Sequence, residues 1–198
     1  RLVAAATIAM PRFMFLSAFA NLFGMGGSSL ISRCLGAGDR EKAMRCASFC
    51  IWTGAAAALV YGLLVVLAEP VLLPVLGASQ ETWTYCRQYM LWTIGVGAVP
   101  TVMNAELAHL IRAEGYSKPA GFGVAFGGIL NILLDPLFIF VFKLDIAGAA
   151  IATMLSNLIA MGYFLMFLYR IRKMTVITPN PKKYTLREKI PAEVLTVG

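Results

Sequence analysis

Hydrophobic residues fill long stretches of this chain, and polar residues gather in the short segments between them. Five apolar runs, at about 4–35, 43–68, 83–111, 121–142 and 146–169, are each long enough to cross a bilayer. A membrane-spanning helix needs about 20 residues. The pattern therefore predicts an all-α, polytopic membrane protein.

Composition supports this prediction. Of the 198 residues, 59% are hydrophobic and 14% are charged, and the mean hydropathy is +0.75. Soluble domains carry roughly 25% charged residues. The formal net charge is +7, but most of the basic residues flank apolar runs, where they act as topology signals. Because no basic face interleaved with aromatic residues is present, nucleic acid is excluded as a partner.

The distribution of basic residues predicts how the chain is oriented. They are concentrated in the connections 33–45 and 112–118 and in the tail 170–189. The opposite side carries only Arg1, Lys143 and Arg87. Since cytoplasmic connections are enriched in Lys and Arg, we expect the first, third and fifth runs to cross from outside to inside. The predicted location is the cytoplasmic (inner) cell membrane, with several passes.

The chain divides into three parts. Residues 1–170 form a bundle of spans, 171–189 a cytoplasmic linker with a Pro-Asn-Pro sequence, and 190–198 the start of a second unit. Residues 69–77, which contain two prolines, are expected to form a short interfacial segment outside the spans. The first apolar run begins at once, without the basic region of a signal peptide. Residues 190–198 resemble the amphipathic approach to another apolar segment that is cut short, so we expect a fragment of a larger protein.

Asp135 is the most informative residue, because it is the only ionisable side chain in residues 119–142. A carboxylate at hydrocarbon depth is costly and commonly marks an ion or proton pathway. Asn131 lies one helical turn before it on the same face. Pro136 is a helix breaker without an N–H, which leaves the Ile132 carbonyl unpaired. These oxygens suit an alkali cation, and the carboxylate alone can hold a proton. The alternative is an Asp that only staples helices together.

The neighbouring runs add further polar candidates. Thr153 and Asn157 share a helix face, and each is either interhelical glue or a ligand. Small residues at 148–152 permit close packing, which would bring Thr153 near Asp135 if the last two runs form a hairpin. Asn104, beyond a kink at Pro100, is a candidate for lining a pocket.

Other reactive side chains have simpler interpretations. Glu106 is expected to reach the membrane interface, with a pairing to His109 as the alternative. The cysteines follow no metal or redox spacing and are expected to be packing residues. They are Cys34, Cys46, Cys50 and Cys86. We therefore expect no metal site apart from a coupling-ion site.

Three stretches carry a family resemblance. They are FGMGGSSLISRCLGAGD at 23–39, IRAEGYSK at 111–118, and NILLDPLFIF at 131–140 followed by AGAAIAT at 147–153. Together they resemble multidrug and toxic compound extrusion (MATE) transporters of the DinF and NorM type. The resemblance covers nearly the whole chain, and the last stretch is the most specific.

The resemblance implies a twelve-helix, two-lobed antiporter that exports cationic or amphipathic drugs in exchange for Na⁺ or H⁺. This chain would supply helices two to six, while helix one and the C-lobe would be absent. In archaeal and DinF-like members, the N-lobe cation site uses an Asp on helix one, an Asn and an Asp on helix five, and a Thr on helix six. The last three match Asn131, Asp135 and Thr153. Asn104 and Asn157 become candidates for the drug cavity.

The resemblance also implies the partners: drug-like small molecules, the lipid bilayer and the remaining helices, with Na⁺ or H⁺ as coupling ion and no other cofactor. One alternative is a flippase for lipid-linked oligosaccharides or polysaccharides, whose cavity tends to carry cationic residues, whereas the deep charge here is acidic. An intramembrane enzyme would need a Ser/His pair, a His-Glu-x-x-His motif or paired carboxylates, and the spans contain none. A membrane scaffold would leave Asp135 without a role. We therefore expect a transporter and not an enzyme.

Overall fold

A computed structural model describes residues 2–75, 83, 87–178 and 190–196, and every regular element in this part of the chain is helical. The α-helices are α1 (Leu2–Gly36), α2 (Arg40–Val75), α4 (Ala98–Ala113), α5 (Ser117–Pro136), α6 (Asp145–Arg170) and α7 (Ile190–Leu195). Among the described residues, four helices are long and apolar enough to cross a membrane. The bent pair Arg87–Val96 and Ala98–Ala113 gives a fifth crossing if it is counted as one span. The all-α prediction is confirmed.

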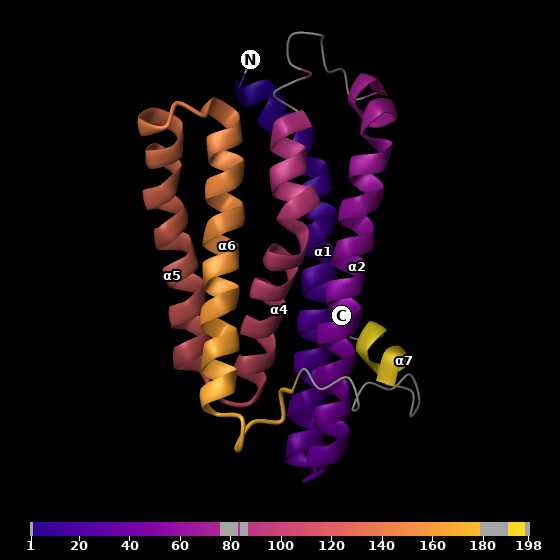
Figure 1. The fold of residues 1–198 in the computed structure, drawn as a ribbon. Coiled ribbons are helices and arrows are strands. Elements are labelled where there is room, and N and C mark those ends of the chain that lie inside the picture. Colours follow the sequence, from indigo (N-terminus) through magenta and orange to yellow (C-terminus); the bar gives the residue numbers. More distant parts are fainter. Residues whose placement is uncertain (1, 76–82, 84–86, 179–189, 197–198) are drawn as a thin grey trace.

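The long helices form a bundle in which α4 is central. Figure 1 shows the α5–α6 hairpin on one side, α1 and α2 on the other, and α4 between them. Accordingly, α4 packs against all four of these helices. The short helix α7 packs on α1 and α2 near one end of the bundle. Polar side chains on α4 can therefore meet partners from either side.

Small residues allow α5 and α6 to approach closely. A Cβ added at Gly123 would come within 2.4 Å of the Phe164 ring, and one at Gly127 within 3.0 Å of Ala160 Cβ. At the other end of the hairpin, a Cβ at Gly148 would meet the Phe138 carbonyl group at 2.9 Å. Such contacts are typical of helix packing in membranes, where small residues let backbones come together.

Two helical segments have the wider π geometry, and they correct two expectations about proline. We expected Pro136 to break its helix, but the coil continues as the π-helix η2 (Leu137–Val141). Short π-helical segments inside helices are frequent at functional sites. The π-helix η1 (Leu91–Val96) precedes a bend of 46°. This bend lies at Gly97 and not at Pro100.

The segment 69–77 is also placed differently from the expectation. Helix α2 runs without interruption to Val75, through both prolines, and residues 76–77 lie outside the described part. Prolines are tolerated in membrane helices because neighbouring groups compensate for the missing hydrogen bond. Glu69 forms an ion pair with Arg87 across an Oε1–Nε distance of 3.2 Å. This pair ties α2 to the start of the next span.

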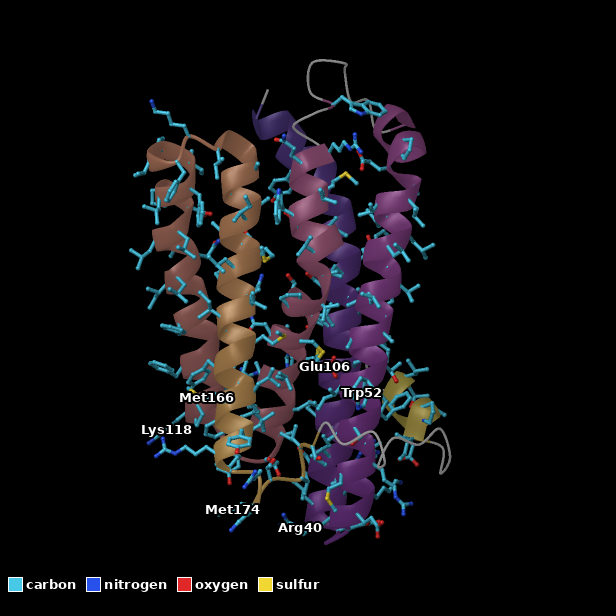
Figure 2. The ribbon with its side chains drawn as sticks, viewed as in Figure 1. Arg40, Trp52, Glu106, Lys118, Met166 and Met174 are labelled. Carbon is cyan, nitrogen blue, oxygen red and sulfur yellow. The ribbon has the colours of Figure 1, made fainter. Side chains whose placement is uncertain are left out.

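The end of the bundle that carries Arg40 and Lys118 also holds the segment after α6 (Figure 2). Glu114, in the α4–α5 connection, accepts hydrogen bonds from the Thr175 hydroxyl and the Val176 backbone N–H. Ser48 of α2 donates to the Thr178 carbonyl at 2.8 Å. The first part of the predicted linker is therefore packed on the bundle, whereas residues 179–189 lie outside the described part.

Candidate functional site

The residues predicted to form a cation site lie together where α5 meets α6. The Asn131 side-chain amide donates from Nδ2 to Asp135 Oδ1 at 3.4 Å and to Thr153 Oγ1 at 3.3 Å. All three side chains are half-buried. The four-residue spacing on α5 places Asn131 and Asp135 on one face, and the tight α5–α6 packing brings Thr153 opposite them. The structure thus joins all three predicted residues.

The cluster carries oxygen atoms of the kind that small, hard cations bind. It offers the carboxylate oxygens of Asp135 and the hydroxyl oxygen of Thr153, which are ligand types that hard cations prefer, while Asn131 directs its Nδ2 toward both of these residues. Asp135 supplies the only charge among the three side chains. A single proton or monovalent cation would therefore neutralise the cluster. Pro136 lies directly after the carboxylate, at the junction of α5 with η2, and cannot donate a backbone hydrogen bond.

The two pocket candidates form a second cluster between α4 and α6. Asn104 donates from Nδ2 to Asn157 Oδ1 at 2.8 Å, and Asn157 donates from Nδ2 to Thr101 Oγ1 at 3.2 Å. Asn104 Oδ1 is buried and has no hydrogen-bond partner in the described part of the protein. The cluster thus holds one free acceptor in a buried position. Its position next to the cation candidates follows from α6, on which Thr153 and Asn157 lie one turn apart.

Sequence reasoning missed two residues near these clusters. Thr101 lies three residues before Asn104, on the same face of α4, and this spacing could have identified it. Tyr89 is half-buried and lies within electrostatic range of Asp135. No local pattern singles out Tyr89, because its proximity depends on how two distant helices pack.

The expectation for Glu106 is wrong. Its side chain is 0% exposed and lies inside the bundle between α4 and the α1–α2 pair (Figure 2). Neither carboxylate oxygen has a hydrogen-bond partner among the described residues, so the alternative pairing with His109 is not made either. The residue does not reach the interface because α2 covers it: Gly54, which has no side chain, lies directly against the carboxylate.

The cysteines of the described residues lie in packed positions. Cys34, Cys46 and Cys50 are free and buried, and Cys86 lies outside the described residues. Within the described part of the chain, no group of three or more His, Cys, Asp or Glu side chains could hold a metal ion.

Known proteins resemble this chain in sequence. The MatE family model matches residues 1–137. The multidrug export protein MepA of Staphylococcus saprophyticus is 32% identical over the whole chain, and MepA of Staphylococcus aureus is 31% identical. The chain covers 43% of each of these relatives and so spans less than half of their length.

Solved structures give the same result. A crystal structure described as MATE in complex with MaD5 superimposes with a TM-score of 0.91 at 28% identity, over 99% of this chain and 44% of that one. An inward-facing multidrug resistance MATE family transporter gives a TM-score of 0.86 at 28% identity, over 100% of this chain and 44% of that one. From the family match, the relatives and the shared fold, we conclude that the chain belongs to the MATE family.

Proposed function

We propose that this chain is the N-lobe part of a cation-coupled antiporter that exports cationic or amphipathic drugs across the cytoplasmic membrane. The observation that carries this proposal is the contact of Asn131 with both Asp135 and Thr153. A carboxylate held by neutral oxygen-bearing groups between two membrane helices provides a site for Na⁺ or H⁺. The MATE family membership and the multidrug export relatives support the same function.

The proposed coupling works through the charge of Asp135. When an external cation binds, the carboxylate is neutralised and its hydrogen bond with Asn131 weakens. Asn131 also contacts Thr153, so the packing of α5 against α6 changes, and this change favours drug release to the outside. When the cation leaves to the cytoplasm, the carboxylate regains its charge and attracts a cationic drug. A ligand can shift such an equilibrium only by its difference in affinity for the two states.

The cluster of Asn104, Asn157 and Thr101 is proposed to contact the drug. It lies one turn of α6 from Thr153, and Asn104 Oδ1 is a buried acceptor with no partner among the described residues. An acceptor of this kind can receive a hydrogen bond from an ammonium or amide group of a drug. Drug binding sites are mainly apolar, with a few polar groups that fix orientation.

A lipid-linked oligosaccharide flippase is less well supported. Such a protein would need cationic groups for the phosphate of its substrate. Asp135 lies half-buried between helices of the described bundle, and the negative charge of its carboxylate would repel that phosphate. No observation on the described residues favours the flippase over the antiporter.

The proposal is tested by reconstituting the natural protein that carries this sequence into liposomes. Transport of a fluorescent cationic dye is measured with and without an imposed Na⁺ or H⁺ gradient. Dye movement that requires one of these gradients is expected. Equal movement without any gradient would contradict cation coupling.

A further inference from the structure

Glu106 is a buried carboxyl group that the proposed coupling and drug sites do not use. Its side chain is 0% exposed, and in the described part of the protein both of its oxygens lack hydrogen-bond partners. The great majority of buried polar side chains have partners. An unsatisfied carboxyl group in the core of a helix bundle therefore requires an explanation.

The surroundings of Glu106 leave room for a carboxyl group. A Cβ added at Gly54 of α2 would lie 2.0 Å from Glu106 Oε2 and 3.0 Å from its carboxyl carbon. Any larger residue at this position of α2 would displace the carboxyl group. Glycine at position 54 thus provides the space that Glu106 occupies between the helices.

The titratable groups that face Glu106 are thiols. They are Cys46 of α2 and, one turn further along the same helix, Cys50. From α1, Gly27 packs against Cys50 and presents no titratable group. On α4 itself, His109 packs against Gly24 of α1. No Lys or Arg among the described residues forms a hydrogen bond with Glu106.

These neighbours determine what Glu106 can bind. Thiols and glycines do not supply the several hard oxygen ligands that an alkali or divalent cation needs. An ionised carboxylate without a partner in such a place would cost several kcal/mol, even after relaxation of the protein. A proton removes that charge and needs no further ligand.

We propose that Glu106 is a second proton-binding site of this protein, separate from the Asn131–Asp135–Thr153 cluster. It carries its proton in the packing seen here and releases it when α2 moves away from α4. In that step the O–H bond of the carboxylic acid breaks, water accepts the proton, and the electron pair stays on the carboxylate. The proton-loaded state does not depend on the proposed function, whereas the use of this proton in transport does.

The position of Glu106 indicates the side to which the proton would be released. Glu106 lies in the half of the bundle nearer to the end that carries Arg40, Lys118 and Met174 (Figure 2). The positive-inside rule assigns that end to the cytoplasm. Water that enters between α2 and α4 from the cytoplasmic end would therefore have a shorter route to Glu106 than water from the opposite end.

Infrared spectroscopy tests the proton-loaded state without any transport assay. The natural protein is labelled with ¹³C-glutamate, so that carbonyl bands of protonated Glu shift and those of protonated Asp do not. At neutral pH we expect a protonated Glu band that is lost in Glu106→Gln, kept in Asp135→Asn, and reversibly lost from the folded protein at alkaline pH. A missing band would show that Glu106 is ionised, and a band unchanged by alkali would show a sealed structural acid. Either result would overturn the proposal.

A second measurement examines transport. Gln has the shape of the protonated acid but cannot release a proton. Glu106→Gln is therefore expected to insert normally and to show a pH profile of dye export that differs from that of the wild type, because only the contribution of Asp135 remains. If the variant kept the wild-type pH profile, Glu106 would not exchange its proton during transport. If the wild type showed no gradient-driven export, the proposed function would fail, while the infrared result would still decide whether Glu106 binds a proton.

Discussion

Asn131 Nδ2 lies 3.3 Å from Thr153 Oγ1, and this hydrogen bond joins α5 to α6 at the residue that also holds Asp135. One amide group therefore contacts both the carboxylate of Asp135 and a side chain of the neighbouring helix. A change in the protonation or cation occupancy of Asp135 alters what this amide can bind. This relationship connects cation binding to helix packing in the proposed mechanism.

Replacing Thr153 by Val tests the role of the hydroxyl group, because Val keeps the branched shape and removes the oxygen. The lost hydrogen bond is worth about 1 kcal/mol, so we expect the cation concentration for half-maximal dye export to rise about fivefold. Thr153→Ser is the matched control and should behave like the wild type. Equal cation dependence in Thr153→Val and the wild type would exclude the hydroxyl group from the site.

Replacing Asn157 by Ala tests the second cluster. The substitution removes the partner of Asn104 and Thr101 and leaves buried polar groups unpaired, at a cost of about 1–3 kcal/mol in stability. We expect an altered ranking of exported dyes with unchanged cation dependence, measured in competition assays. The neighbouring Leu158 is 41% exposed, and Leu158→Ala should leave the ranking intact. A change of cation dependence alone in Asn157→Ala would argue against a drug-contacting role.

The close approach of α5 and α6 predicts a strong effect at Gly123. An added methyl group would lie 2.4 Å from the ring of Phe164, which is 0% exposed. Overpacking of this kind costs about 1–3 kcal/mol, so Gly123→Ala should lower the thermal unfolding temperature. A Cβ at Gly121 meets nothing within 4 Å, so Gly121→Ala is the control. If both variants melted at the same temperature, the packing described here would be wrong.

Glu114 is predicted to hold the segment after α6 on the bundle. Hydrogen bonds to charged groups contribute about 1.5–3 kcal/mol, and Glu114 accepts two, from Thr175 and from the Val176 N–H. In Glu114→Ala, hydrogen exchange at the Val176 amide should therefore accelerate more than tenfold. Lys118→Gln, at an exposed position in the first turn of α5, should leave exchange unchanged. Unaltered exchange in Glu114→Ala would contradict the contact.

Local patterns in the sequence were sufficient to predict the helical class and the grouping of Asn131, Asp135 and Thr153. Spacing of four residues fixes a helix face, and the glycine and alanine residues before Thr153 indicated where two helices pack closely. Long apolar runs identify membrane helices because a segment inside the bilayer must satisfy its backbone hydrogen bonds internally, which a helix does.

The environment of Glu106 could not be predicted in this way. Whether an acid near a helix end reaches the interface depends on the helix that faces it, and here that helix presents Gly54. The path of α2 beyond Pro70 was missed for a related reason. Proline disfavours helix locally, but the surrounding apolar helix continues through it to Val75. Both outcomes depend on contacts between segments far apart in the sequence.

The central claim is that the carboxylate of Asp135 couples cation entry to drug export. The most direct measurement is dye export by the natural protein, wild type against Asp135→Asn, in liposomes under an imposed Na⁺ or H⁺ gradient. The account predicts that Asp135→Asn inserts and folds normally but loses gradient-driven export. Export by Asp135→Asn at the wild-type rate would contradict it and would leave Asp135 with a structural role only.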